Sequence, residues 1–322
     1  INNHFSDLRA PVSENAREWT TFGRYLLLEK IGTGGMAEIF RAKTFGAAGF
    51  EKEFAIKLIL PALIDDKEFV DMFINEAKIS GIIETNPGFN SVLLEYDWRQ
   101  ISYDELVREA LALADEVGTP DEIESRLIHF PTLYLDPWTR ECMEDYHRNI
   151  KERPYDPEFI VSENGLSDVD ELVALHAASE YWIGIIGAYP GLPLMRPLDP
   201  RCQIYSPKYD PPRMWTPQGA VVCAGGASAI QTLRSPGGFN MIGRTPIPLL
   251  DPKRCIPAFR GNIVLLRPGD RIKFDPIDHG EYERIAQKIT EGSYAFNIID
   301  YQRFSLSTYE TWVASLDDRE RY

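Results

Sequence analysis

Three clusters in the second half of the sequence combine glycine, proline and basic residues, which are residue types that bind small anions. The clusters span residues 187–201, 207–227 and 235–246. Adjacent glycines let a ligand approach backbone amides closely, and such amides bind an anion or a urea-like carbonyl. Lys208, Arg213 and Arg244 add positive charge to a chain whose net charge is −15, as expected where a carboxylate or carbonate is held. We predict that these three basic residues are catalytic.

The same clusters supply the residues that we predict to bind the substrate, namely Tyr189, Tyr209, Gly225, Gly226, Pro236, Gly237 and Gly238. Several of these predictions have a structural alternative. Gly237 and Gly238 also suit a corner of a barrel, Tyr209 also suits a hydrophobic core, and Arg244 also suits an ion pair with a carboxylate. A real site requires Lys208, Arg213 and the bend at residues 236–238 to share one cavity.

A glycine-rich stretch near the start, "IGTGGMAEIF", has the composition of a phosphate-binding loop. A strand, a glycine turn and a second strand are predicted around Gly32 and Gly34, and Lys57 lies in the next strand. Glu76 falls on the apolar face of a predicted helix, where it needs a partner such as Lys57. A dinucleotide-binding G-x-G-x-x-A pattern also fits, but a strand follows it where a helix is required. These four residues either bind a nucleotide or form a structural element with an ion pair.

This stretch resembles the N-lobe of a bacterial Ser/Thr protein kinase, where a glycine loop, a strand lysine and a helix glutamate occur in this order. Phosphoryl transfer in that family also requires a catalytic-loop aspartate and a DFG aspartate. Neither follows here. The nearest match is "YHRNI", in which Asn149 replaces the aspartate within a predicted helix. We therefore expect no kinase activity.

The rest of the chain predicts an α+β fold, with a small α/β part followed by a mainly β part. Ser102 and Glu105 form a capping box that opens a helix, and Asp136 with Pro137 opens another. A shorter helix is predicted over 167–179. From residue 181 onward, short apolar runs separated by Pro and Gly indicate a barrel or sandwich. The segment 262–277 is predicted to be two strands joined by a tight turn.

Composition excludes several classes of protein. A net charge of −15 over 322 residues argues against a nucleic-acid surface, which needs clustered Lys and Arg. Four widely spaced cysteines without a CxxC pair favour free thiols, and the absence of an HExxH pattern gives no reason to assign a metal. The start of the sequence lacks the basic and apolar regions of a signal peptide. A cytoplasmic protein with no membrane and no nucleic-acid partner is the expectation.

The clusters resemble the carboxyltransferase domain of urea carboxylase (urea amidolyase) and its KipI-like relatives. Those relatives are allophanate hydrolase subunit 1, a subunit of prokaryotic 5-oxoprolinase and an inhibitor of a sporulation histidine kinase. The motifs that carry the resemblance run from about residue 81 to 316 and occur in order: "NPGFNSVLLEYD", "SENGL", "PLDPR", "KYDPPRMWTP", "PGGF", "IGRTP" and "FSLSTYETWVA". The resemblance implies a cyclophilin-like β-barrel preceded by a small α/β subdomain.

The resemblance also implies a function and a set of partners. In that family the unit forms half of a site, where a carboxyl group passes from carboxybiotin to urea or a related amide. The implied cofactor is biotin on a separate carrier domain, with ATP used only by partner subunits. The implied partners are a companion, KipA-like carboxyltransferase subunit, a biotin carboxylase and a biotin carrier. The alternatives are a subunit of an ATP-dependent 5-oxoprolinase or amide hydrolase, and a KipI-like kinase-regulating protein without catalysis.

Together these observations divide the chain into four parts. They are an N-terminal lead over 1–21, a kinase N-lobe-like segment over 22–80, a small α/β subdomain over 81–127 and a carboxyltransferase barrel over 128–322.

Overall fold

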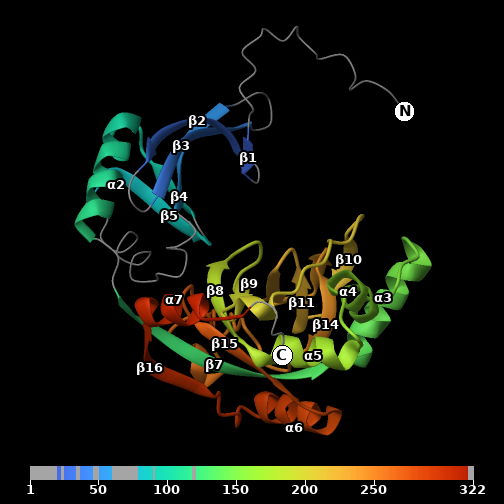
Figure 1. The fold of residues 1–322 in the computed structure, drawn as a ribbon. Coiled ribbons are helices and arrows are strands. Elements are labelled where there is room, and N and C mark those ends of the chain that lie inside the picture. Colours follow the sequence, from blue (N-terminus) through green and yellow to red (C-terminus); the bar gives the residue numbers. More distant parts are fainter. Residues whose placement is uncertain are drawn as a thin grey trace, which may run out of the picture. The chain divides into compact units, whose positions relative to one another are not determined.

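A computed structural model of the chain describes residues 20–22, 25–33, 37–45, 51–59, 79–89, 91–117 and 121–317. The chain divides into two compact units. The first is built around strands β1 to β6 and helix α2, and the second contains everything from β7 onward (Figure 1). Mixed helices and sheets confirm the predicted α+β class. Within the described ranges, no helix is both long and apolar enough to cross a membrane.

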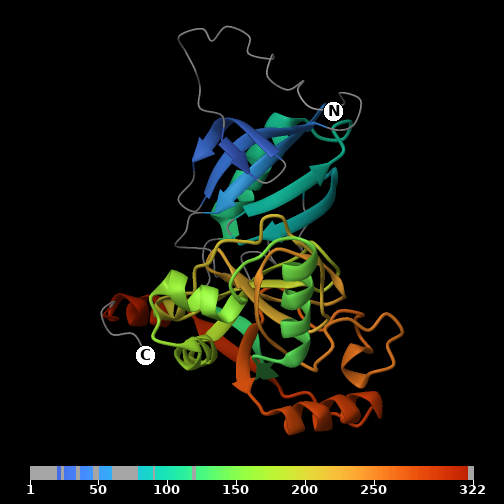
Figure 2. The same cartoon turned by 90° about the vertical axis from the view of Figure 1, so that its right-hand side faces the viewer.

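The first unit is one six-stranded sheet covered on one face by α2 (Figures 1 and 2). The strand order is β1-β2-β3-β4-β6-β5. Its elements are β1 (Thr20–Phe22), β2 (Tyr25–Thr33), β3 (Ala37–Phe45), β4 (Glu51–Ile59), β5 (Ile82–Gly88), β6 (Ser91–Tyr96) and α2 (Tyr103–Val117). The helix buries Leu106, Ala110 and Leu113, whose spacing forms one apolar face. The predicted capping box is present, because Ser102 N donates to Glu105 and Glu105 N donates to Ser102 Oγ.

The boundary predicted at residue 80 runs through this sheet. Strand β4, in the segment predicted to be kinase-like, pairs with β6, in the predicted α/β subdomain, with Ile56 opposite Leu93. A strand that lacks a partner on one edge leaves backbone groups unpaired, so this ladder joins the two segments. A helix was predicted over 65–82; its residues 65–78 lie outside the described residues, and Ile82 begins β5.

The second unit contains an eight-stranded sheet in the order β14-β11-β12-β9-β8-β15-β7-β16 and a two-stranded ribbon, β10-β13. Its strands are β7 (Glu122–Tyr134), β8 (Glu180–Ile186), β9 (Pro193–Pro197), β10 (Arg213–Thr216), β11 (Ala220–Ala224), β12 (Ala227–Ile230), β13 (Ser235–Gly237), β14 (Asn240–Arg244), β15 (Arg271–Pro276) and β16 (Ile298–Ser305).

The long strand β7 closes this sheet into a barrel. One edge of β7 pairs in parallel with β15, from Leu127 to Thr132. The other edge pairs first with β16 and then, at Leu133 and Tyr134, with β14. Because β14 is the far end of the strand order, this last pairing completes the ring. The turn signals predicted a barrel or a sandwich, and the closed strand order is that of a barrel, while its likeness to cyclophilin stays a prediction.

Helices surround the barrel, with α3, α4 and α5 on one side and α6 on another (Figures 1 and 2). They are α3 (Pro137–Asn149), α4 (Asp156–Asn164), α5 (Val169–Ala178), α6 (His279–Thr290) and α7 (Leu306–Ala314), with short 3-10 turns η3 (Pro200–Cys202) and η4 (Pro257–Phe259). Asp136 caps α3 as predicted, accepting from the backbone of Trp138 and Thr139.

The structure differs in two details from the strands and turns expected in the predicted mainly β part. Helices α6 and α7 interrupt it, each opened by a side-chain cap, from Asp278 and Ser305. The first strand expected within 262–277 is reduced to a single bridge between Leu250 and Val264. The tight turn after it does form, and its Asp270 is buried under the guanidinium of Arg126.

Strand β11 is buried on both faces, and this determines where a pocket can form. Val221 and Cys223 belong to the largest buried cluster. Ala220 and Val222 face a second cluster together with Met143 of α3. Successive side chains of β11 point to opposite faces of the strand, so one face packs in the main core and the other forms part of a second, smaller apolar surface.

A neutral histidine lies inside the main core. His176 is fully buried, its Nδ1 is 2.8 Å from the Tyr134 hydroxyl and its Nε2 is 3.2 Å from Ser228 Oγ. Burial lowers the pKa of His176 to about 3, because a charged imidazole is poorly solvated there.

This lowered pKa predicts acid destabilisation of the barrel. Above pH 6.5 both folded and unfolded forms carry neutral His176; as the pH falls, the unfolded form protonates first and stability is lost. Between pH 7 and 5 the loss from this residue is about 2 kcal/mol. Urea unfolding at both pH values measures it. His176→Gln should flatten the dependence and the exposed His279→Gln should not; equal slopes in all three proteins would contradict the prediction.

Candidate functional site

One cavity of about 260 Å³ in the second unit brings together six of the ten residues that were predicted to be catalytic or to bind substrate. It lies against the outer apolar surface of β9, β11 and β12, between the β10-β13 ribbon and the loop that joins β8 to β9. Its lining residues are Ala188, Tyr189, Leu192, Leu194, Lys208, Arg213, Val222, Ala229, Gln231, Pro236, Gly237, Gly238 and Phe239. The requirement that Lys208, Arg213 and the 236–238 bend share a cavity is therefore met.

Arg213, the first residue of β10, is the buried cation of this cavity. Its side chain is 2% exposed and is the largest of the fully buried side chains in the described part of the chain. Its Nη2 donates to Thr216 Oγ1 at 3.2 Å, and its Nη1 has no hydrogen-bond partner among the described residues. The guanidinium also lies over the ring of Tyr209, 4.2 Å from the centroid. An arginine stays charged under all ordinary conditions, so the cavity has a permanent positive wall.

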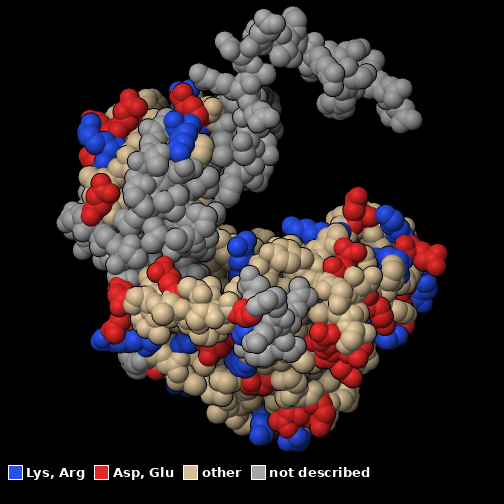
Figure 3. Space-filling model, in the orientation of Figure 1, with Lys and Arg blue, Asp and Glu red and all other residues tan. Residues whose placement is uncertain are grey.

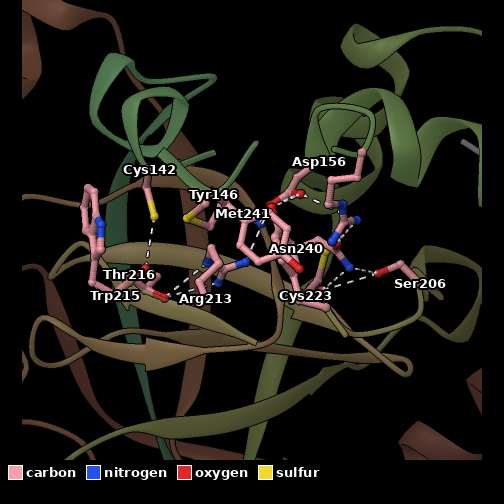
Figure 4. A network of polar contacts seen from close by, with 12 residues as sticks. Cys142, Tyr146, Asp156, Ser206, Arg213, Trp215, Thr216, Cys223, Asn240 and Met241 are labelled. Carbon is pink, nitrogen blue, oxygen red and sulfur yellow. Dashed lines mark hydrogen bonds and ion pairs between the residues drawn. The ribbon is translucent and has the colours of Figure 1, made fainter. Parts of the chain in front are cut away.

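Asp156, at the start of α4, provides the nearest counter-charge. Its carboxylate is 0% exposed and lies 3.9 Å from Arg213 Nη1. The backbone N–H of Met241 donates to it at 2.7 Å, and the Tyr209 hydroxyl donates to its other oxygen. Burial raises the pKa of Asp156, while Arg213 acts in the opposite direction. Figure 4 shows this network, which joins α4 to β10 and β14.

Lys208 is the second cation, and it lies at the exposed end of the cavity. Its Nζ is 5.1 Å from the centroid of the Phe239 ring. No hydrogen bond or ion pair is formed by its ammonium group within the described residues, and none of the cavity-lining residues is acidic. Two cations without a carboxylate in the lining favour an anion or a carbonyl oxygen as ligand.

The β10-β13 ribbon holds the glycine bend against Arg213. Gly237 is the register partner of Arg213. A Cβ at Gly237 would lie 2.5 Å from Thr216 Oγ1 and 3.2 Å from Arg213 Nη2. A glycine at position 237 is thus required for the close approach of β10 and β13. The bend at residues 236–238 is both a corner of the ribbon and part of the cavity wall.

The loop between β8 and β9 forms the opposite lip. Ala188 has a φ of +65°, a conformation that is costly for a residue with a side chain. Tyr189 follows it, and its hydroxyl is 3.5 Å from the carbonyl of Pro236 across the cavity. Between them, Gln231 is buried and donates to Ser235 Oγ at 3.2 Å.

Two predicted residues lie near the cavity but do not line it. Tyr209 was predicted to bind substrate, and its buried ring contacts the guanidinium groups of both Arg153 and Arg213. Arg244 was predicted to be catalytic, yet it donates to Gln218 O at 2.7 Å and stacks over Trp138. A bulge in the pairing of β11 with β14 places Arg244 opposite Ala220, on the face of the smaller apolar cluster, but Arg244 is not among the residues that line the cavity.

The predicted role of Gly225 and Gly226 in binding stays a prediction, because both glycines lie outside this cavity. They form the two-residue turn between β11 and β12, with φ of +58° and +79°, as tight hairpins require. A Cβ at Gly226 would lie 2.6 Å from Gln203 Nε2. Neither glycine lines the cavity.

The predicted nucleotide site stays a prediction. Gly34 and Glu76 lie outside the described residues. Gly32 in β2 pairs with Ile39 of β3, and Lys57 in β4 pairs with the same residue from the other side. The strand order predicted around the glycine stretch is thus confirmed, and the Lys57 side chain lies outside what the structure describes.

Sequence reasoning missed Asp156, Thr216, Gln231 and Phe239. Thr216 lies three residues after Arg213 in the motif "KYDPPRMWTP", and Phe239 ends the motif "PGGF", so the sequence did carry a signal for both residues. Asp156 comes from a helix start more than fifty residues away in sequence, where an Asp-Pro pair has no special meaning without the fold.

A buried thiol near the cavity is not a nucleophile. Cys142 Sγ donates to the carbonyl of Trp215 at 3.1 Å. Burial raises the pKa of Cys142 to about 12, so the thiol is neutral at ordinary pH.

Comparison with known families decides the assignment of the chain. Residues 41–260 match the family described as carboxyltransferase domain, subdomain C and D. The chain belongs to this family. The match confirms the resemblance drawn from the motifs, and it begins inside the segment 22–80, in agreement with the continuous β3-β4-β6 ladder.

Two relatives and one solved structure place this domain more closely. The chain is 30% identical over 251 residues to urea amidolyase of Saccharomyces cerevisiae, covering 76% of this chain and 14% of the yeast protein. It is 27% identical over 220 residues to a 5-oxoprolinase subunit of Bacillus subtilis, covering 65% of this chain and 82% of that subunit. The crystal structure of urea carboxylase from Kluyveromyces lactis shares the fold, with a TM-score of 0.76 at 22% identity, over 89% of this chain and 26% of that one.

A shorter similarity concerns a kinase. The chain is 49% identical over 59 residues to the tyrosine-protein kinase MasK of Myxococcus xanthus, which is 9% of that kinase. A kinase N-lobe-like role for residues 22–80 stays a prediction.

The close approach at Gly237 predicts a sharp difference between adjacent glycines. Gly237→Ala places a methyl against Thr216 and Arg213 and should lower the free energy of unfolding by about 1–3 kcal/mol. At Gly238 the nearest atom to a new Cβ is Lys208 Cβ at 3.7 Å, an ordinary contact, so Gly238→Ala should change it by under about 0.5 kcal/mol. Chemical denaturation measures both. Equal effects would show that the ribbon does not hold Arg213 as described.

Proposed function

We propose that this chain forms one half of a carboxyltransferase site that places a carboxyl group on the nitrogen of urea or a related amide. The observation that carries the proposal is the single cavity that unites the buried Arg213, the exposed Lys208 and the Gly237 bend with no acidic residue in its lining. The family match, with its subdomains C and D, supports the reaction class. The likeness to urea amidolyase supports the acceptor.

The residues of the cavity fit a carboxylated biotin, which when bound supplies the carboxyl group. Lys208 and Arg213 offer cations to a carboxylate or a ureido oxygen. Leu194, Val222 and Phe239 offer an apolar wall for a fused ring. Biotin is thus the proposed cofactor, carried by a separate domain and recharged by an ATP-using biotin carboxylase.

The chain's own residues act by position and charge. Lys208, exposed and unpaired within the described residues, attracts an anion to the entrance. Arg213, in a site of low polarity, stabilises negative charge that develops on the transferred carboxyl or on the acceptor oxygen, without reorganising. The apolar wall keeps water away, so this stabilisation is stronger than it would be in solvent. The close glycine bend keeps the ligand next to the guanidinium.

The chain covers 14% of the yeast urea amidolyase, so the remaining functions belong to partners in this proposal. A companion carboxyltransferase subunit would supply the second half of the site. The family's own description names only subdomains C and D, which supports a complementary half elsewhere.

A second candidate function has its own support. The match to the 5-oxoprolinase subunit of Bacillus subtilis covers 82% of that subunit, much more than the share of urea amidolyase. In this case the same cavity would bind a lactam and the companion subunits would use ATP. Avidin, which sequesters biotin, separates the two: it abolishes carboxyl transfer and leaves lactam hydrolysis unchanged.

Carboxyl transfer in the reconstituted complex tests the proposal. Arg213→Lys keeps a charge but loses the planar donors, and kcat should fall by about 100-fold. Lys208→Ala should lower kcat/KM by about tenfold. The matched control is Lys253→Ala, an exposed lysine outside the cavity, which should behave as wild type.

The proposal fails if both cavity variants, folded as judged by their thermal melts, transfer the carboxyl group at the wild-type rate. It also fails in its biotin form if turnover persists unchanged in the presence of avidin.

A further inference from the structure

Asp156 does not line the cavity, yet it is the most completely buried charged side chain that faces Arg213. It belongs to a cluster of two arginines, one carboxylate and one tyrosine, shown in part in Figure 4. Arg153 lies 3.7 Å from one carboxylate oxygen of Asp156 and Arg213 lies 3.9 Å from the other. Both ion pairs are longer than a hydrogen bond.

The hydrogen bonds of Asp156 go to other groups. Met241 N donates to one oxygen and the Tyr209 hydroxyl donates to the other. These donors come from β14 and from the chain just before β10, so they fix the carboxylate from two sides. Arg213 therefore experiences the field of Asp156 but donates no hydrogen bond to it. Its Nη1 is the atom left without a hydrogen-bond partner in the described residues.

Tyr209 links the two arginines to this carboxylate. Arg153 Cζ is 3.7 Å and Arg213 Cζ is 4.2 Å from the centroid of its ring. Both guanidinium groups therefore lie within cation–π distance of one ring. Tyr146 contacts the same ring in a T-shaped arrangement, with centroids 4.7 Å apart. The buried Tyr209 ring is thus a contact that the Arg213 guanidinium shares with Arg153.

The cluster also leaves one positive charge in excess. Arg153 donates to Asn240 Oδ1 at 2.8 Å and lies beside Asp156, so it shares the single carboxylate with Arg213. Since the cavity lining has no acidic residue, the excess charge is not cancelled on the cavity side within the described residues. A bound carboxyl group is the natural complement.

We infer that Asp156, with the Tyr209 hydroxyl, is a positioning residue of the cavity: it orients the Arg213 guanidinium toward the transferred carboxyl group without forming the hydrogen bond that would occupy it. This inference rests on the proposed carboxyltransferase function. The competing role is structural, because the Met241–Asp156 hydrogen bond also joins α4 to β14.

A double-mutant cycle on the reconstituted complex separates the two roles. Asp156→Asn keeps the shape but removes the charge, and kcat should fall by about tenfold with KM changed little, since the effect is on orientation. In an Arg213→Lys background the same substitution should cause no further loss of kcat, because its effect passes through the guanidinium. A structural role would lower the melting temperature equally in both backgrounds and leave kcat of the folded protein unchanged.

Tyr209→Phe keeps the ring and deletes one donor to Asp156, so it tests the inference if Asp156→Asn does not fold. We expect about a threefold loss of kcat that also disappears in the Arg213→Lys background. Wild-type kcat in Asp156→Asn and Tyr209→Phe, or losses that multiply with that of Arg213→Lys, would overturn the inference while leaving the proposed function standing. Wild-type transfer by Arg213→Lys would also overturn the inference, and the proposed function itself fails only if Lys208→Ala transfers the carboxyl group normally as well.

Discussion

The burial of one guanidinium group is the constraint on which the functional face of the barrel depends. Taking a charge out of water is expensive unless counter-charge and hydrogen bonds surround it. At 3.9 Å the attraction between Arg213 and Asp156 is about 4 kcal/mol at an effective dielectric of 20, and desolvation of both groups offsets much of it. The surrounding elements therefore have to supply further contacts, and they do so from widely separated parts of the sequence.

The fold provides those contacts through three independent segments. Helix α4 begins at Asp156, the chain before β10 brings Tyr209, and β14 offers the N–H of Met241. The closed strand order fixes β14 next to β11, and the two-sided burial of β11 creates the apolar floor beside which the cavity lies. In Figure 3, acidic and basic side chains are interspersed over the drawn face of the barrel unit. The cavity lining, which has two cations and no acidic residue, thus differs from this surface, where both signs of charge are mixed.

Local patterns predicted the parts of this structure that depend on neighbours in sequence. The caps at Ser102 and Asp136 and the strands around Gly32 all follow from short-range geometry. The convergence of Lys208, Arg213 and Gly237 was a requirement of the predicted site, and the cavity meets it. Long-range facts escaped prediction. No residue near Asp156 in the sequence indicates that it pairs with Arg213, and the position of Arg244 depends on a bulge in the pairing of β11 with β14 that the sequence does not reveal. The helices α6 and α7 were not predicted, because the frequent Pro and Gly residues of this region indicated short strands and turns.

The most direct measurement of the central claim is the 15N–1H NMR signal of the Arg213 Nε–H group during titration with oxamate, a stable planar amide that carries a carboxylate. A buried guanidinium that faces the ligand should give a saturable shift of this signal, weaker in Lys208→Ala and absent when neutral acetamide replaces oxamate at the same concentration. A signal that stays in place up to saturating oxamate would contradict the claim that Arg213 serves an anion in this cavity.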